Sequence, residues 1–203
     1  MNDLPPWAFD REDAGDDLSF YAPPRLVTHL DEGAVAALTD CYREVVPDGG
    51  RVLDLMSSWI SHLPPERDYT AVVGHGMNAT ELAANERLTR WFVQDLNRDP
   101  ALPLEDGAFD AALCCVGVQY LRQPFAVFAQ VRRVLVPGAP FVVSFSNRCF
   151  PTKAVAVWRA LDTAGHARLV RLYLERAGFA DGDVRVLADG AAGDPLVAVI
   201  GRA

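Results

Sequence analysis

From residue 51 onward, short apolar runs alternate with segments in which apolar residues recur at helical spacing. Five of the runs are almost continuously hydrophobic, which is typical of strands buried on both faces of a parallel sheet. They cover residues 51–55, 69–74, 91–94, 109–116 and 140–146. Two more strands are expected at 183–187 and 196–200, and the Gly- and Asp-rich loop 188–195 between them predicts a closing hairpin.

Helices are predicted between these strands from their end signals. Asn78, followed by Glu81 three residues later, has the capping-box spacing and should open a helix that runs to about residue 85. Pro124 is suited to a first helical position, and Pro137-Gly138 stops that helix. A helix over 166–177 should end at Gly178. The alternation predicts an α/β fold: a Rossmann-like open sheet of about seven strands, mostly parallel, with a C-terminal antiparallel hairpin and helices on both faces.

The N-terminal segment has a different composition. Six acidic residues and one arginine fall within residues 1–20, without a sustained apolar period, so we expect this part to be poorly ordered; an acidic docking arm is the alternative. Residues 21–203 should form one domain, in which 21–46 are a helical extension and 21–25 an extended entry.

Charge and cysteine content narrow the function. A net charge of −8 offers no basic field for nucleic acid or anionic lipid. No apolar run is long enough to span a bilayer, and the N-terminus lacks a secretory signal pattern, so a cytoplasmic location is expected. The four cysteines have no metal-site spacing and should be reduced, mostly buried thiols, and no metal is expected. The sequence does not define an oligomeric state.

Polar residues follow each predicted strand. In an open parallel sheet, ligands bind beyond the carboxyl ends of the strands, where the strand order reverses. The segments expected at that edge are 56–59 (MSSW), 75–78 (HGMN), 95–97 (DLN), 117–120 (GVQY) and 146–148 (SNR). We therefore expect the ligand site there.

Six stretches, in order and spacing, carry a family resemblance. They are 52–55 (VLDL), 72–74 (VVG), 93–95 (VQD), 102–110 (LPLEDGAFD), 120–121 (YL) and 133–138 (RVLVPG). Over about residues 51–146 the chain resembles the class I S-adenosylmethionine-dependent methyltransferases of small-molecule type. The resemblance implies S-adenosylmethionine as cofactor and a small-molecule methyl acceptor.

The resemblance also implies residue roles. Asp54 and Ser57 would lie near the methionyl end of the cofactor, and Asp95 would contact the adenine with Leu96 beside it; Met56, Ser58, Gly76, Met77 and Asn78 complete the expected cofactor site. Two positions depart from the family pattern. The loop after the first strand has no glycine, and Gly76 stands where the family has an acidic residue for the ribose. Asn78 is the nearest replacement. Gly76→Asp is expected to tighten cofactor binding if the lost carboxylate is the main defect, whereas unchanged or weaker binding would indicate a loop rebuilt around His75 and Asn78.

The acceptor side is assigned from the remaining polar and aromatic residues at this edge. Candidate substrate-binding residues are Tyr21, Trp59, Asn147 and Arg148, and candidate catalytic residues are His62, Gln119 and Tyr120. Arg148 has no acidic residue nearby in the segment 149–157 and is expected to hold an anionic or carbonyl-bearing acceptor.

Several residues have two interpretations. Trp59 could stack on a ligand or fill the space that glycines would leave, and His75 could bind a ligand or act within the fold. His29 and His166 are expected to be packing or surface residues. The function expected is methyl transfer to a small molecule. The alternatives are a methyltransferase fold used for another reaction and a non-catalytic partner protein.

Overall fold

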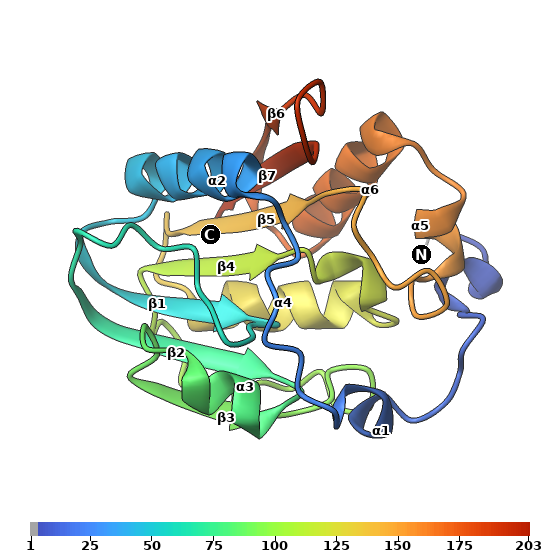
Figure 1. Cartoon of the computed structure of the whole chain (residues 1–203), viewed down its shortest axis with the longest axis horizontal. Coiled ribbons are helices and arrows are strands. Elements are labelled where there is room, and N and C mark those ends of the chain that lie inside the picture. Colours follow the sequence, from blue (N-terminus) through green and yellow to red (C-terminus); the bar gives the residue numbers. More distant parts are fainter. Residues whose placement is uncertain (1–3) are drawn as a thin grey trace.

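A seven-stranded sheet forms the centre of the protein, which the computed structural model describes over residues 4–203 (Figure 1). Its strands are β1 (Gly49–Leu55), β2 (Tyr69–Gly76), β3 (Arg90–Val93), β4 (Ala111–Cys115), β5 (Pro140–Phe145), β6 (Ala180–Ala188) and β7 (Leu196–Arg202). The strand order is β3-β2-β1-β4-β5-β7-β6. The first five strands are parallel, and β7 runs antiparallel to both β5 and β6. The predicted α/β sheet with its C-terminal hairpin is confirmed.

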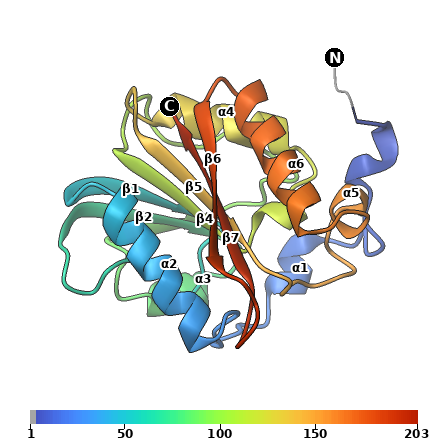
Figure 2. The ribbon, with the colours of Figure 1, turned by 90° about the horizontal axis from the view of Figure 1, so that it is seen from above.

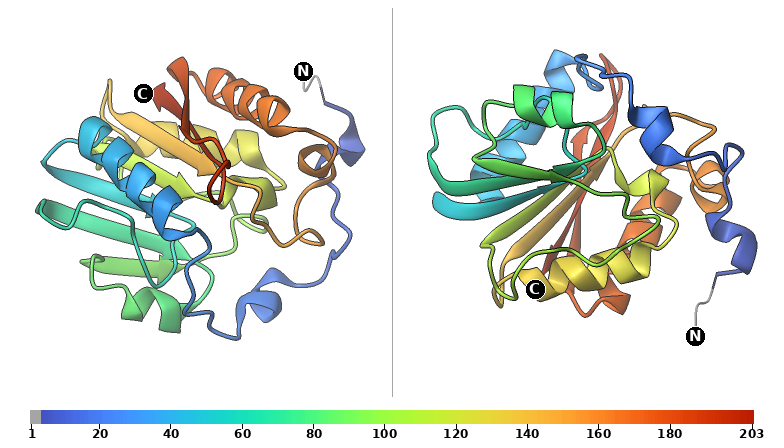
Figure 3. Two further views of the ribbon diagram at one scale, coloured as in Figure 1. Left: turned by 45° about the horizontal axis from the view of Figure 1, so that its top comes forward. Right: turned by 90° about the horizontal axis from the view of Figure 1, so that it is seen from below.

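Helices cover both faces of the sheet (Figures 2 and 3). On one face lie α2 (Glu32–Val45) and α3 (Ala79–Ala84); on the other lie α4 (Pro124–Val134) and α6 (Thr163–Arg176). Pro124 is the first residue of α4, as predicted, and Gly178 follows α6 with a φ of 84°. Each face has its own apolar core. The core under α4 and α6 contains the ring cluster of Phe128, Phe141 and Tyr173.

The N-terminal segment is ordered where the structure describes it, and this differs from the expectation for residues 1–20; residues 1–3 lie outside the described part. It contains the short helices η1 (Pro6–Phe9) and α1 (Asp17–Tyr21). The backbone N–H of Asp13 donates to the Thr152 carbonyl, and the Ala156 N–H donates to the Asp10 carbonyl. The acidic composition concealed this order because its charges are paired within the fold.

Buried ion pairs attach the N-terminal segment to the rest of the fold. The Asp17 carboxylate accepts hydrogen bonds from Arg11 at 2.7 Å and from the Asn97 amide at 3.0 Å, and it lies 3.0 Å from Lys153 Nζ. Burial would raise the pKa of Asp17, but the hydrogen bonds from Arg11, Asn97 and Lys153 outweigh it and lower that pKa. Lys153 is only 1% exposed. Removing one of these partners would leave a buried charge without compensation.

Residues 16–31, called the covering segment below, cross the carboxyl ends of β1, β2 and β4 (blue in Figure 1). The loops at those strand ends hold the segment in place. The Asn78 amide donates to the carbonyls of Tyr21 and Ala22 at 2.8 and 2.9 Å, and Trp59 Nε1 donates to the Val27 carbonyl at 3.0 Å. The chain therefore closes one side of the predicted ligand edge with its own N-terminal region.

Candidate functional site

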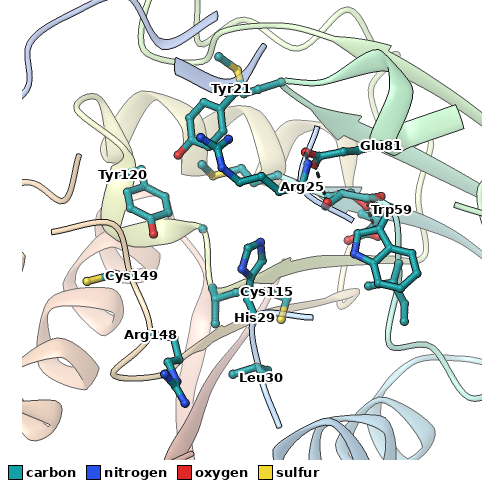
Figure 4. Close-up of a pocket in the computed structure, with 18 of the residues that line it drawn as sticks. Tyr21, Arg25, His29, Leu30, Trp59, Glu81, Cys115, Tyr120, Arg148 and Cys149 are labelled. Carbon is teal, nitrogen blue, oxygen red and sulfur yellow. Dashed lines mark hydrogen bonds between the residues drawn. The ribbon is translucent and has the colours of Figure 1, made fainter. Parts of the chain in front are cut away.

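A cavity of about 580 Å³ lies between the covering segment and the carboxyl edge of the sheet (Figure 4). This volume is typical of small-molecule sites. The wall comes from the loops after β1, β2, β3, β4 and β5, from the covering segment and from the β6–β7 loop. Among the described residues that line it, six carry carboxylates and two carry guanidiniums. The lining therefore favours a ligand with positive charge.

Asp54 ends β1 at the floor of the cavity, with 5% of its surface exposed. Its Oδ2 accepts hydrogen bonds from the hydroxyls of Ser57, at 2.7 Å, and Ser61. Burial raises the pKa of Asp54, and these two hydrogen bonds lower it only in part. The serines of the glycine-free loop thus supply the partners that a buried carboxylate needs.

The loop after β1 is fastened to the end of β2 through His75. The Met56 N–H donates to His75 Nδ1 at 3.1 Å, and the Ser57 N–H donates to the His75 carbonyl at 2.7 Å. His75 Nε2 lies 2.9 Å from the Gln94 carbonyl, so the ring carries its proton on Nε2. Burial lowers the pKa of His75 to about 4. His75 therefore acts within the fold, and of its two interpretations the structural one is confirmed.

Gly76 is required by this loop. A Cβ at position 76 would lie 2.5 Å from the Ser57 carbonyl oxygen. A side chain there would push against backbone, so the expected benefit of Gly76→Asp contradicts the geometry. The missing glycines after β1 and the missing carboxylate after β2 are consequences of a single rearrangement.

Glu81 brings a carboxylate into the cavity from the first turn of α3. Its Oε2 accepts from the Ser58 hydroxyl at 2.6 Å, and its Oε1 accepts from the Arg25 N–H at 2.7 Å. Asn78 caps α3, as expected, by accepting from the N–H groups of Thr80 and Glu81. Glu81 makes no return bond to the Asn78 N–H, so only the first half of the predicted capping box forms, because the Glu81 side chain turns toward the cavity.

Asp95 and Leu96 line the cavity after β3, and both are buried. Asp95 Oδ1 accepts from the Asn97 N–H at 2.9 Å. Asn97 in turn donates to Asp17 and to the Tyr120 carbonyl, each at 3.0 Å. This turn therefore links the β3 end of the cavity to the buried ion pairs that hold the N-terminal segment.

The opposite end of the cavity is aromatic. Tyr21, Tyr120 and Phe150 line it, and the Phe150 ring lies edge-on to Tyr21 at 6.3 Å between centroids. The Arg25 guanidinium lies 5.7 Å from the Tyr21 ring centre and 5.2 Å from that of Phe150. Tyr120 Oη accepts from the Phe150 N–H at 2.9 Å, and burial raises the pKa of Tyr120 to about 12. Tyr120 therefore keeps its proton at neutral pH.

Arg148 lines the cavity as expected, but the argument that it lacks a carboxylate partner is wrong. Its Nε donates to Asp194 Oδ1 at 2.7 Å, and Asp194 comes from the β6–β7 loop, far along the chain. Asp194 also accepts from the Asp31 N–H, and the Asp194 N–H donates to Asp31. Arg148 thus pairs with Asp194, which is bonded in turn to Asp31 at the end of the covering segment.

Most of the sequence-predicted residues meet at this cavity. Those that line it are Asp54, Met56, Ser57, Ser58, Met77, Asp95 and Leu96 of the cofactor set, Tyr21, Trp59 and Arg148 of the substrate set, and His62 and Tyr120 of the catalytic set. Gly76, Asn78, Asn147 and Gln119 are not in the lining.

Each of these four residues has a physical reason for its position. Gly76 is covered by the Ser57 carbonyl, and Asn78 uses its amide to cap α3 and hold the covering segment. Gln119 is 1% exposed and donates to the Val116 carbonyl, and Asn147 is exposed beside Ser146. The structure does not bring these four residues into the cavity lining, and a ligand contact for them stays a prediction.

Two residues of the lining have unusual backbone conformations. Met56 has a φ of 56° and Val116 a φ of 44°, in the left-handed region that a β-branched residue rarely adopts. They follow β1 and β4, the neighbouring strands at which the order of the sheet reverses. Backbone strain of this kind is concentrated at functional sites.

Comparison with known proteins agrees with this geometry. Residues 61–143 match the model of a family described as methyltransferase domain. The chain is therefore similar to methyltransferase domains over these residues. A methyltransferase described as S-adenosylmethionine-dependent, from Mesorhizobium loti, is 19% identical and superposes with a TM-score of 0.60 over 83% of this chain and 98% of its own. No curated protein matches the chain.

Two further solved structures share the methyltransferase fold. A putative methyltransferase in complex with the Trm112 activator from Haloferax volcanii is 15% identical, with a TM-score of 0.65 over 85% of this chain and 90% of that one. The [4+2]-cyclase SpnF is 17% identical, with a TM-score of 0.63 over 89% of this chain and 87% of that one. At these identities the likeness establishes the fold.

The Mesorhizobium loti protein is described as S-adenosylmethionine-dependent, and the residues present in this chain fit that cofactor. The molecule carries a sulfonium and an ammonium, and the cavity has a surplus of carboxylates. Asp54 and Asp95 lie at the ends of the edge formed by β1 and β3, as the motif match predicts. Glu81 offers the carboxylate that Gly76 does not. The chain is therefore equipped with acceptors for the polar groups of the cofactor.

The lining residues that sequence reasoning missed include Arg25, His29, Glu81, Cys115 and Phe150. His29 was placed among packing or surface residues, but it lies in the covering segment and not on a helix. The capping-box pattern already gave Glu81 a role at the start of its helix, so the sequence indicated no further role in ligand binding. Among residues 4–203, no helix has the length and hydropathy needed to cross a membrane.

Proposed function

We propose that this methyltransferase transfers the methyl group of S-adenosylmethionine to a small, uncharged acceptor with an aromatic or otherwise planar body. The observation that carries the proposal is one cavity with two chemically different ends. One end has the carboxylates of Asp54, Glu81 and Asp95; the other has the rings of Tyr21, Tyr120 and Phe150. The cofactor is assigned to the first end and the acceptor to the second.

At the first end, Asp95 and Leu96 hold the adenine, Glu81 accepts from the ribose hydroxyls, and Asp54 with Ser57 faces the methionyl group. Each Glu81 oxygen has one protein hydrogen bond, and a carboxylate has about four acceptor positions, so capacity remains for the ribose. When bound, the cofactor supplies an activated methyl group. The protein's contribution is to hold the acceptor in line with it, and alignment of this kind accounts for much of the rate of such reactions.

At the second end, the charges disfavour an anion. Arg148 is paired with Asp194, and Arg25 is stacked among the rings of Tyr21 and Phe150. Arg148 therefore already has a carboxylate partner, and the Arg25 guanidinium donates to the Phe20 carbonyl. The rings instead provide flat apolar walls for a planar molecule.

The acidic balance of the chain supports a small acceptor over nucleic acid. A cytoplasmic location stays a prediction from the sequence, and the four cysteines are free thiols in the structure.

The proposal is tested by calorimetry with S-adenosylhomocysteine on the wild type and on Asp95→Ala. We expect binding by the wild type, and a tenfold to hundredfold weaker affinity for the variant, because a hydrogen bond to a charged group contributes about 1.5–3 kcal/mol. Asp110→Ala, a carboxylate at the opposite edge of the sheet that pairs with Arg51, is the control and should bind normally. Absence of binding by the wild type would refute the proposal.

A second candidate function is catalysis of a different reaction in the same cavity. It is favoured by the rebuilt loop after β1 and by the structural likeness to a [4+2]-cyclase. Product analysis separates the two: methyl transfer releases one S-adenosylhomocysteine for each product formed, whereas a repurposed enzyme would turn over its substrate without that release.

A further inference from the structure

The four histidines of this chain fall into two groups by their hydrogen bonds. His75 bonds through both ring nitrogens, and His166 lies 2.8 Å from the Trp158 carbonyl through Nε2 while its ring stacks on Trp158 at 3.9 Å. Among residues 4–203, the rings of His29 and His62 have no hydrogen-bond partner, and both line the cavity. Imidazoles without partners in a ligand cavity are available for chemistry.

His29 is the more accessible of the two. His62 Nδ1 is buried and lacks a partner, whereas His29 lies in the covering segment and is exposed within the open cavity. In Figure 4 its ring points into the space between Tyr120 and Trp59. Its orientation is fixed by an edge-on contact with Phe150, 6.1 Å between ring centroids.

The groups around His29 act on its protonation in opposite directions. Burial lowers the pKa of His29, Glu81 raises it and Arg25 lowers it. The pKa of His62 is lowered by burial and further by the charge of His29. The other polar groups around this part of the cavity are Tyr21, Cys115, Tyr120, Arg148 and Cys149.

We propose that His29 is the catalytic base of the methyl transfer and that the acceptor is a neutral O–H compound, such as a phenol, with its ring against Tyr120 and Phe150. This rests on the proposed function. His29 accepts the hydroxyl proton while the acceptor oxygen forms a bond to the methyl carbon. The bond from that carbon to sulfur breaks, and sulfur keeps the electron pair.

A base has a clear purpose in this reaction. A phenol with an ordinary pKa near 10 is protonated at neutral pH, and its methylation without a base would leave a positive charge on oxygen. His29 removes the proton as the new bond forms.

The first test uses phenol as the probe and NMR of ¹⁵N-labelled histidine rings. S-adenosylhomocysteine is added first; if it fails to bind, the proposed function fails whatever His29 does. With it bound, phenol is expected to shift the ring-nitrogen signals of His29 and to leave those of His75 and His166 in place. No shift at His29, with or without shifts elsewhere, overturns the assignment.

The second test is kinetic, with phenol as acceptor and release of S-adenosylhomocysteine as the readout. We expect His29→Gln to lower kcat by about 10²–10⁴-fold with little change in KM, and added imidazole to restore part of the rate in His29→Ala. The wild-type rate should fall as the pH drops below the pKa of His29, and His29→Gln should lose that fall. His166→Gln is the control. A change in KM alone, or absent turnover by the wild type, overturns the proposal.

Discussion

Asp54, in β1, and Asp95, after β3, lie at the same carboxyl edge of the sheet two strands apart, yet their surroundings differ. Asp54 is enclosed by a loop that hydrogen-bonds it through Ser57 and Ser61, and that loop is fastened to β2 by His75. Asp95 belongs to a short turn that bonds its own backbone and is linked to the N-terminal segment through Asn97. The loop after β1 therefore departs from the family pattern and is held by residues of the β1–β2 region itself. The turn after β3 keeps the family pattern and adds a contact to the N-terminal segment.

The difference shows that two departures from a family motif can have one structural cause. The Ser57 carbonyl occupies the space that a side chain at position 76 would need. A loop with this path and an acidic residue after β2 are mutually exclusive. The carboxylate of Glu81, one turn into the next helix, is compatible with both.

Gly76→Asp should have the largest effect on stability, because it disrupts the packing of the loop after β1 against the end of β2. We expect a loss of about 3 kcal/mol of unfolding free energy, at the upper end for overpacking, because the new Cβ meets backbone. Thermal unfolding and calorimetry with S-adenosylhomocysteine measure this together. Gly33→Ala, in α2, is the control and should not destabilise, since its Cβ has room. Unchanged stability with tighter binding would show that the loop moves aside.

Lowering the pH should destabilise the same region, because it protonates His75. A pKa lowered from 6.5 to about 4 in the folded state means that the neutral ring stabilises the protein above pH 6.5. This contribution, about 3 kcal/mol in full, is lost as the pH falls from 6.5 toward 4. Chemical denaturation of the wild type between pH 4 and 7 should show the loss, and His75→Gln should lack most of it. An identical acid response in the variant would contradict the assignment.

Glu81→Gln tests whether the Glu81 carboxylate contributes to cofactor binding. We expect about tenfold weaker binding of S-adenosylhomocysteine, since a charged acceptor becomes a neutral one, with little change in folding. Glu86→Gln, an exposed residue just beyond α3, is the matched control. A 3′-deoxyribose analogue should lose less affinity in Glu81→Gln than in the wild type. Equal losses would exclude contact between Glu81 and the ribose.

Arg148→Ala should have the smallest effect. Arg148 is 62% exposed, and ion pairs of this kind contribute at most about 1 kcal/mol, or a few degrees in Tm for a chain of this size. Asp194→Asn should cost more because Asp194 is 8% exposed and joins the covering segment to the β6–β7 loop. A fall in Tm for Arg148→Ala as large as that for Asp194→Asn would contradict this order.

The sheet was predictable because its signals are local. Apolar runs mark each strand, and Pro124 and Gly178 mark helix ends within a residue or two. Asp54, Asp95 and Leu96 were also located from their places after strands. The prediction was wrong where a residue's partner lies far along the chain, as for Arg148 with Asp194 and for Asp17 with Lys153. An acidic segment gives no sign of buried partners that lie more than 130 residues away.

Asn78 has a consequence for how the protein opens. Its carbonyl oxygen caps α3, and its amide nitrogen holds the covering segment through Tyr21 and Ala22. A helix of six residues has little stability of its own. Both elements therefore depend on one side chain, and the amide hydrogens of α3 and the covering segment should exchange with solvent in a single opening event. Whatever enters or leaves the cavity by lifting its cover also loosens the helix that presents Glu81.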